Sequence, residues 1–568
     1  MRGRTAAWLL PALVFALLHA RALDYGFVWV DEAEIATGTI LRPPGRILAA
    51  FREPLQDLSG YAVRPYVQPY YRPLQVVLAS ALDAGFGREP RSFRAASLAL
   101  GTATSALFGL LALGVLGRSG PAALAACAFA AHPVGLEIYV WISGLSAALV
   151  GLWLVASLLA GQRALAASGG ARLAWIGASA LALALGLLSK ENAAVGPALQ
   201  LALAAGAAAQ ARRTRVAGPP WRAVAALVAL QAALVAGYLF ALRPAVLGHA
   251  LTGAGWIGGS RATQWATALA LWPELLAWLF APLHSTTSDA VRVVTSARDP
   301  LALAGLALAA GSAVAWALCL RRGHGAAAAG LAWIWIAFLP TSGLAPLLHA
   351  HAERNLFPAV FGAALLQGAA LGALLRRGLP AALGAALAAA LVGALAERTW
   401  ARTPAWRSTA ELFGRDVAAD PRHREGRLNL AVGHLLAGRA EAARREAAAL
   451  AAQDPVREGW HSYLLEQSLH QLVCVANAAA GRDADTFARY PLAAPPGPAE
   501  IWREPGFRAC QAEALERLGR CALALPIYAE LARGASGDDA AAFAQGAQRC
   551  ERALSRAPQE PGRSLRPP

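Results

Sequence analysis

Lys190 is the only lysine in the chain, although the 568 residues include 51 lysines and arginines together. It lies in the stretch Ser189-Lys190-Glu191-Asn192, in a short turn between two apolar runs. An ammonium group at the end of a membrane-spanning segment is a candidate to bind a phosphate group. It can equally form a structural ion pair with the adjacent Glu191, and the spacing of the residues fits both interpretations.

Arg354 is a second cation in a short turn between apolar runs. It follows His349, His351 and Glu353 and precedes Asn355. The charge distribution described below puts Arg354 and Lys190 on the outer side of the membrane, where basic residues are uncommon. Both side chains are therefore candidates to bind the phosphate of a lipid.

An acidic pair, Asp31-Glu32, follows the first apolar run, and Glu34 lies two residues further on. A partly desolvated carboxylate is more basic than one in water, so such a pair can accept a proton from a hydroxyl group. This pattern predicts a general base. Ordinary solvated loop charge is the alternative interpretation.

His132 and Glu137 lie where Pro133 ends a short apolar run. Functionally, they would place an imidazole and a carboxylate at the outer rim of the membrane. The alternative is a helix end that happens to carry polar groups. A histidine and a glutamate five residues apart are not sufficient for a metal site. We therefore predict no metal ligands, and dependence on a divalent metal stays open.

The composition shows what kind of fold must position these groups. Hydrophobic residues make up 57% of the chain and charged residues 15%, and the mean hydropathy is +0.42. A soluble domain carries about 25% charged residues, so we expect an all-α, polytopic membrane protein. The net charge is +16, but no polar domain combines clustered arginines with aromatic residues, which argues against nucleic-acid binding.

Eleven apolar runs are long enough to cross about 30 Å of hydrocarbon. We expect transmembrane helices near 5–23, 93–117, 120–136, 139–160, 173–189, 192–210, 222–242, 300–320, 328–347, 355–375 and 379–396. If the N-terminus is cytoplasmic, most of the arginines in short loops lie on the inner side of the membrane. This arrangement requires that residues 263–283 do not cross the membrane, and the Pro273 and Glu274 within them favour a segment that does not cross. The C-terminus is then outside.

Two polar regions lie on the predicted outer side. The first is the loop of residues 24–91, which contains Tyr61, Tyr66, Tyr70 and Tyr71. The second is the C-terminal domain, where residues 426–455 have the spacing of one helical-hairpin repeat and residues 510–529 that of a weaker one. We expect a loop over the Pro-rich residues 491–505. Four cysteines in this domain allow two disulfides in three pairings: Cys474, Cys510, Cys521 and Cys550.

The order of these motifs resembles the transmembrane and tetratricopeptide-repeat O-mannosyltransferases, which belong to the GT-C class of membrane glycosyltransferases. The motifs are Asp31-Glu32, Tyr71-Arg72-Pro73-Leu74, His132-Pro133-Val134 with Glu137 and Trp141-Ile142-Ser143, and Leu188-Ser189-Lys190-Glu191. The similarity covers residues 24–440. The chain departs from the family in its short repeat region and in its last 130 residues.

The resemblance implies transfer of a sugar, with inversion, from a polyprenyl-phosphate donor to a hydroxyl group on the extracytoplasmic face. It makes Asp31 the base and Glu32 an acceptor-positioning or secondary acid. Lys190 and Arg354 would bind the donor phosphate. The side chains that would shape the site are His132, Glu137, Tyr71, Arg72 and Glu191.

We therefore expect a GT-C-like domain over residues 1–398, with its first outer loop at 24–91, and a partly tetratricopeptide-like domain over 399–568. The expected location is a bacterial inner membrane, with the N-terminus in the cytoplasm and the C-terminal domain in the periplasm. The acceptor is a protein Ser/Thr, a glycan or a lipid. A non-catalytic membrane scaffold that presents the helical domain is the alternative function, and a transporter is another, although the sequence shows no internal repeat symmetry.

Overall fold

The computed structural model describes residues 2–55, 70–248, 256–283, 291–347, 349, 351–453, 460–490, 492, 505–535 and 537–556. Tyr61, Tyr66 and most of the predicted 491–505 loop lie outside these residues. The described part contains helices, turns and loops and no strand, which confirms the all-α prediction. The chain forms two compact units, Met1–Ser408 and Thr409–Pro568. α15 (Ala381–Arg402) runs past the boundary expected at residue 398.

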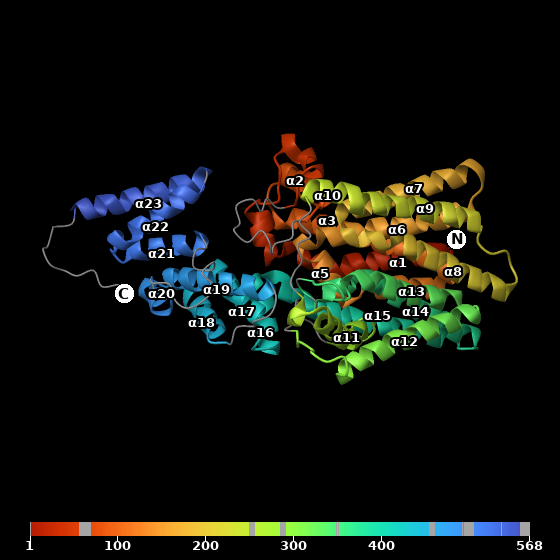
Figure 1. Ribbon diagram of the computed structural model, residues 1–568. Helices are drawn as coiled ribbons and strands as arrows, with labels where there is room; N and C mark the ends of the chain where they lie inside the picture. The colour runs from red at the N-terminus through yellow and green to blue at the C-terminus, as the bar shows by residue number, and fades with distance from the viewer. Residues whose placement is uncertain are drawn as a thin grey trace. The chain divides into compact units, whose positions relative to one another are not determined.

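Long helices of the first unit lie side by side along its length (Figure 1). The helices besides α15 are α1 (Arg2–His19), α2 (Pro73–Phe86), α3 (Pro90–Leu116), α4 (Ser119–Ala130), α5 (Leu136–Tyr139), α6 (Leu145–Ala166), α7 (Gly169–Ser189), α8 (Gly196–Thr214), α9 (Trp221–Gly237), α10 (Arg243–Leu247), α11 (Arg261–Ala277), α12 (Pro300–Arg321), α13 (Gly325–Phe338) and α14 (Phe357–Arg376).

Among the described residues, nine helices are long and apolar enough to cross a membrane, and the bent pair of Ser119–Ala130 and Pro133–Tyr139 makes a tenth. α13 is shorter, with 14 residues. At one end, His324 accepts a hydrogen bond from Arg213, which lies at the end of α8 (2.8 Å). At the other end, Thr341 donates to the Asn355 carbonyl oxygen (2.8 Å). α13 overlaps the predicted span 328–347, but it belongs to the shorter apolar helices, so ten of the eleven predicted spans have a candidate helix when the bent pair is counted as one.

α11 corresponds to the segment predicted not to cross, and it is not among the candidate spans. Near its start, Gln264 donates to the Gly343 carbonyl oxygen (2.5 Å), and further along Trp272 donates to Ser342 (2.9 Å). After its end, the Leu279 carbonyl oxygen accepts from His132 (3.2 Å). Both ends of α11 therefore contact the same end of the bundle, as expected of a segment that does not cross.

We call this end of the bundle the distal end. There α1, α4, α7 and α13 finish and α3, α6, α8 and α14 begin. The opposite end carries the arginines predicted for the inner loops: Arg118, Arg163, Arg172, Arg212, Arg213, Arg215, Arg222, Arg321, Arg322, Arg376 and Arg377. All the candidate site residues lie toward the distal end, between or beside the helix termini.

Close helix contacts hold the bundle together. At the crossing of α13 and α14, a Cβ atom at Gly362 would lie 2.8 Å from the Gly330 carbonyl oxygen, so only glycine fits there without a shift. Small residues at such crossings let helix backbones approach within a membrane. Next to this crossing, the rings of Phe129 and Phe361 stack with centroids 4.2 Å apart. This packing fixes α14, whose first residues follow Arg354.

The second unit contains more repetition than the sequence indicates. Three helical hairpins each turn at a Gly-Arg pair, and the glycine φ is +69° at Gly438, +68° at Gly481 and +70° at Gly519. Glycine adopts this left-handed conformation without steric cost, which makes it the preferred residue after a helix end. The helices are α16 (Thr409–Ala419), α17 (Arg424–Leu436), α18 (Ala440–Ala451), α19 (Trp460–Ala479), α20 (Asp483–Arg489), α21 (Pro505–Arg517), α22 (Cys521–Gly534) and α23 (Gly537–Arg556).

One of the two disulfides allowed by the sequence is present. Cys474 on α19 is bonded to Cys510 on α21, across 36 residues of sequence. Cys521 and Cys550 are buried thiols, and each lies within hydrogen-bonding reach of the other. The disulfide therefore links the second hairpin to the third.

Replacing Cys474 and Cys510 by serine should destabilise the second unit. A cross-link over a loop of this length contributes about 3–4 kcal/mol, mainly by restricting the unfolded chain. We expect limited proteolysis of the full chain to cut this unit at least about tenfold faster in the double variant. Cys319→Ser, in α12 of the first unit, is the control. Equal cleavage rates in the double variant and the wild type would show that the disulfide contributes little.

Candidate functional site

Four segments far apart in the sequence meet at the distal end. They are the loop after α1, the break between α4 and α5, the turn between α7 and α8, and the turn before α14. The predicted site residues Asp31, Glu137, Lys190 and Arg354 come from these four segments in that order. Their contacts, described next, show which of them are brought together.

Asp31 is completely buried, and its carboxylate accepts four hydrogen bonds from described residues. Oδ1 accepts from the Ser143 amide (2.7 Å) and the Ser143 hydroxyl (2.8 Å). Oδ2 accepts from the amides of Val28 (3.2 Å) and Ile142 (3.4 Å). Burial raises the pKa of Asp31 to about 6, against the lowering effects of the Arg94 charge and of the hydrogen bonds from Ser143 and Val28. The group is a base of useful strength near neutral pH, enclosed by the protein.

Glu32 is the more accessible member of the acidic pair. Its side chain is partly exposed, whereas Asp31 has no exposed surface. Burial and then the negative charge of Asp31 raise the pKa of Glu32. Of the pair, Glu32 is therefore the carboxylate with surface accessible to a ligand.

Trp29, two residues before Asp31, adopts a left-handed backbone conformation with φ +58°. This conformation is costly for a bulky side chain and recurs at functional sites. The Trp29 ring stacks on Trp141 (4.8 Å between centroids), and the Arg354 guanidinium carbon lies 5.5 Å from its centre. Trp29 thus connects the acidic pair with the two later segments.

Glu137 and Arg354 form a buried ion pair. The Arg354 guanidinium donates to Glu137 Oε1, and the Arg354 backbone amide donates to Oε2 (2.9 Å). The side chains are 3% and 15% exposed. Because Glu137 balances the guanidinium charge, Arg354 is less available to an anion than the sequence suggested.

Lys190 differs from Arg354 in having no such partner. Among the described residues, no hydrogen bond or ion pair reaches its ammonium group, so the structural pair with Glu191 is not formed. Burial and then the charge of Arg72 lower the pKa of Lys190 to about 8, and Glu191 and Glu137 partly offset this. The group therefore stays charged at neutral pH, and Arg354 lies near enough to add to its electrostatic environment.

Arg72 lies beside Lys190 and contacts Glu191. Its Nη2 atom is 3.9 Å from Glu191 Oε1, and its guanidinium carbon is 4.2 Å from the centre of the Tyr70 ring. The buried Nε–H has no hydrogen-bond partner in the described part of the chain. Tyr71 points elsewhere and donates to the Phe51 carbonyl oxygen (3.1 Å). Arg72 is thus a second donor next to Lys190, and Tyr71 supports the loop.

His132 has a structural arrangement. Nε2 donates to the Leu279 carbonyl oxygen (3.2 Å), and Nδ1 accepts from the Val134 amide (3.3 Å). The ring is 3% exposed and ties the break between α4 and α5 to the end of α11. His132 therefore shapes the distal end without offering a free ring nitrogen.

Within the described residues, no group of three or more His, Cys, Asp and Glu side chains is arranged to hold a metal ion. Nearby acidic groups interact with other side chains. Glu353 pairs with Arg402 (2.7 Å), and Glu274 lies 3.5 Å from His351. These pairs connect the loop before α14 to α15, through Arg402, and to α11, through Glu274.

The sequence did not lead us to predict that Arg94 and Ser143 belong to this site. Arg94 on α3 is 2% exposed and donates to the carbonyl oxygens of Tyr25, Gly26 and Val140. Ser143 supplies two of the four hydrogen bonds to Asp31. An arginine inside a predicted apolar span was a usable signal for Arg94. No local pattern pairs Ser143 with a residue 112 positions away.

Glu137→Gln should destabilise the first unit strongly, because it removes the buried carboxylate that accepts from both the guanidinium group and the backbone amide of Arg354. Removing one member of a buried pair costs about 3–5 kcal/mol. We expect a clear fall in the unfolding temperature in detergent and partial recovery in Glu137→Gln/Arg354→Gln. Glu53→Gln is the control, since its pairs with Arg42 and Arg46 are more exposed. No difference between the Glu137 variant and this control would contradict the assignment.

No known family model and no curated protein matches the sequence. The fold has distant similarity to ArnT from Cupriavidus metallidurans bound to undecaprenyl phosphate, with 14% identity, TM-score 0.38, and coverage of 94% of this chain and 82% of ArnT. It is also similar to an oligosaccharyltransferase from Archaeoglobus fulgidus tethered to an acceptor peptide containing the NVT sequon (16% identity, TM-score 0.39). That match covers 70% of this chain and 55% of the oligosaccharyltransferase, or about half its length.

Proposed function

We propose that this protein is a GT-C-type glycosyltransferase, which moves a sugar from a polyprenyl-phosphate donor to an acceptor hydroxyl at the distal end of the bundle. The observation that carries this proposal is the partner-free ammonium group of Lys190. It lies in the neighbourhood of Arg72 and Arg354, at the membrane boundary, where a lipid-linked phosphate would lie.

The leaving group explains the need for these cations. When the bond between the anomeric carbon and the phosphate oxygen breaks, negative charge grows on the phosphate. Fixed cations that face this charge stabilise the transition state more than the ground state. Lys190 provides an ammonium group and Arg72 an unpartnered Nε–H, while the Glu137–Arg354 pair holds the turn beside them.

The acidic pair supplies the base. The acceptor oxygen attacks the anomeric carbon from the face opposite the phosphate, so the configuration inverts, and the acceptor proton passes to a carboxylate. Asp31 is our candidate, because its raised pKa gives it affinity for a proton near neutral pH. The Ser143 hydroxyl, 2.8 Å from Oδ1, donates the kind of hydrogen bond that an acceptor hydroxyl would make in its place. Glu32, with exposed surface, would position the acceptor.

The Trp29–Trp141 stack would complete the site beside the acidic pair. The Trp141 indole N–H is buried and has no hydrogen-bond partner in the described part of the chain. Such a group is available to a hydroxyl of a bound sugar or acceptor. We propose that the distal end is extracytoplasmic and that the acceptor is a protein or a glycan recognised there.

The test is a reconstituted transfer assay. Purified full-length protein is incubated with a radiolabelled undecaprenyl-phosphate hexose, and formation of free undecaprenyl phosphate is measured with and without added membrane-free extracellular protein and glycan fractions. We expect product from the wild type and far less from Lys190→Met at the same subsaturating donor concentration. Equal turnover by the two proteins would contradict the proposal. A non-catalytic scaffold, the alternative, would release no undecaprenyl phosphate in any of these mixtures.

A further inference from the structure

A positively charged pocket lies at the distal end, apart from Lys190, Arg72 and Arg354. Its volume is about 460 Å³, and Arg21, Asp24, Tyr25, Gly26 and Arg407 line it. The segments that contribute these residues are the ends of two candidate spans, Thr5–Asp24 and Ala381–Arg407, and the two residues that follow the first. The pocket therefore lies where the membrane-spanning part of the bundle ends.

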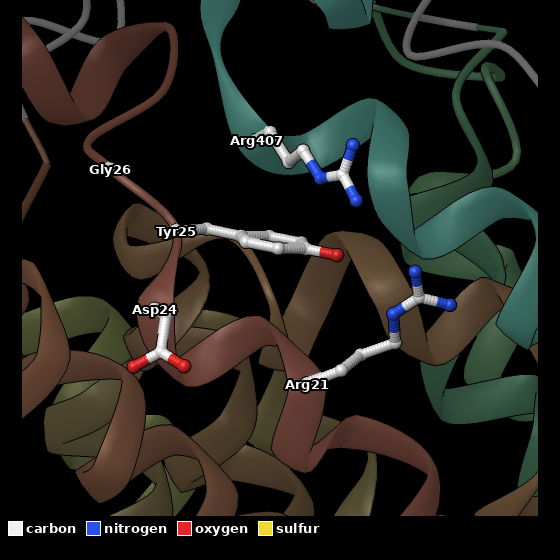
Figure 2. A pocket seen from close by; sticks show the side chains of 5 residues that line it. All are labelled: Arg21, Asp24, Tyr25, Gly26 and Arg407. Atoms are coloured by element: carbon white, nitrogen blue, oxygen red, sulfur yellow. The ribbon is translucent and has the colours of Figure 1, made fainter.

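The two arginines approach the same hydroxyl group from opposite sides. Figure 2 shows the Tyr25 hydroxyl between the guanidinium groups of Arg21 and Arg407. The Arg407 guanidinium carbon lies 5.7 Å from the centre of the Tyr25 ring. The Tyr25 hydroxyl oxygen is buried and has no hydrogen-bond partner among the described residues. The two guanidinium groups and the Tyr25 hydroxyl group are thus hydrogen-bond donors that face the same pocket.

Neighbouring residues hold this arrangement in place. The Arg21 guanidinium carbon lies 4.1 Å from the centre of the Trp400 ring, and Nη1 donates to the Trp400 carbonyl oxygen (3.1 Å). Arg94 Nε donates to the Tyr25 carbonyl oxygen (3.1 Å), and its Nη2 donates to Gly26. Arg21 retains further N–H donors after these contacts, because a guanidinium group carries five. Arg21 and the backbone of Tyr25 and Gly26 are therefore held in place before a ligand binds.

The positive charge of the pocket is not neutralised by its own carboxylate. Asp24 points away from both guanidinium groups (Figure 2) and pairs with Arg91 (3.2 Å). In the described part of the chain, no carboxylate lies within ion-pair distance of Arg21 or Arg407. Two positive charges and a phenolic hydroxyl remain for a ligand.

We propose that this pocket binds the phosphate group of an anionic phospholipid. Guanidinium groups match phosphate oxygens in geometry and charge, and a phenolic hydroxyl adds a third donor. The location at the ends of two spans, next to the half-exposed Trp400, makes the lipid headgroup the source of the phosphate. The pocket shares no lining residue with the proposed sugar-transfer site, so the inference stands without that function.

The experiment is native mass spectrometry of the full-length protein in detergent, titrated with phosphatidylglycerol and, separately, with phosphatidylcholine. We expect one phosphatidylglycerol to bind preferentially to the wild type. Loss of two charge-assisted contacts in Arg21→Gln/Arg407→Gln should weaken this binding at least about tenfold. Tyr25→Phe, which keeps the ring and the fold, should weaken it severalfold. Arg52→Gln, an exposed arginine outside the pocket, is the matched control and should bind as the wild type does.

A parallel titration with inorganic phosphate distinguishes a lipid from a free ion. Thermal stabilisation of the wild type but not of the double variant by millimolar phosphate would support the phosphate site and assign it to a soluble ligand. Equal phosphatidylglycerol binding by the wild type, the double variant, Tyr25→Phe and Arg52→Gln, with no differential effect of phosphate, would overturn the proposal.

Discussion

Lys190→Met should weaken binding of undecaprenyl phosphate about 100-fold, the largest effect that we expect from any single change in binding. The ammonium group has no protein partner among the described residues, so its removal leaves no buried group unsatisfied and costs little stability. It does remove the central cation from the proposed phosphate site. A charge-assisted contact contributes about 1.5–3 kcal/mol, which corresponds to about 10–150-fold in affinity.

Native mass spectrometry and a lipid-dependent shift in unfolding temperature would measure this change. The pKa of Lys190, lowered to about 8, gives the sign of the pH dependence. The cationic form predominates below this value, so wild-type affinity should be constant near pH 7 and fall as the pH rises through 8. Lys190→Arg should retain part of the wild-type affinity for undecaprenyl phosphate. Its affinity should not fall as the pH rises through 8, because the guanidinium group stays charged. Arg52→Met is the control for loss of one positive charge from the same region. Unchanged lipid affinity in Lys190→Met would remove Lys190 from the site.

Asp31→Asn should lower the transfer rate about 1,000-fold while donor binding stays within a few fold, since general base catalysis contributes about 10²–10⁴. In the wild type, Asp31 acts as a base only when it is ionised. With a pKa raised to about 6, transfer at saturating donor should be maximal above pH 7 and fall as the pH is lowered through 6. The measurement is single-turnover transfer against pH, together with the unfolding temperature.

Two further variants show whether the loss of rate comes from the loss of Asp31 as the base. Ser143→Ala removes the hydroxyl bonded to Asp31 Oδ1 but keeps the Ser143 amide bond, so we expect a smaller loss of rate and a shifted pH profile. Glu32→Gln should mainly raise the KM for the acceptor. Near-normal transfer in Asp31→Asn combined with loss of transfer in Glu32→Gln would move the base to Glu32, which is the more exposed carboxylate.

The sequence predicted the membrane fold well because its signals are local. Apolar length alone locates the spans, and arginine placement alone separates the two ends of the bundle. The same logic identified α11 as a segment that stays at one end, from Pro273 and Glu274. It also identified Lys190 as unusual. These conclusions need only composition and order along the chain.

The partners of the site residues were not predictable in the same way. Glu137 and Arg354 are 217 residues apart, and nothing in either motif shows that one neutralises the other. Asp31 and Ser143 are 112 residues apart, so the enclosure of the Asp31 carboxylate could not be anticipated. In the second unit, the turn at Gly481-Arg482 was overlooked because the short helix α20 carries little apolar periodicity. Long-range contacts depend on how helix ends meet, which no local pattern encodes.

The disulfide between Cys474 and Cys510 also has a bearing on membrane topology. Structural disulfides persist in compartments that oxidise thiols and are rare in the cytosol. An intact bond in protein isolated from cells with blocked thiols would therefore assign the second unit to the oxidising side. If the nine candidate spans, the bent pair and α13 all cross the membrane, the crossings number eleven, and an odd number puts the two ends of the polypeptide on opposite sides. With that number of crossings, the state of one covalent bond near the C-terminus would also report the compartment of the N-terminus.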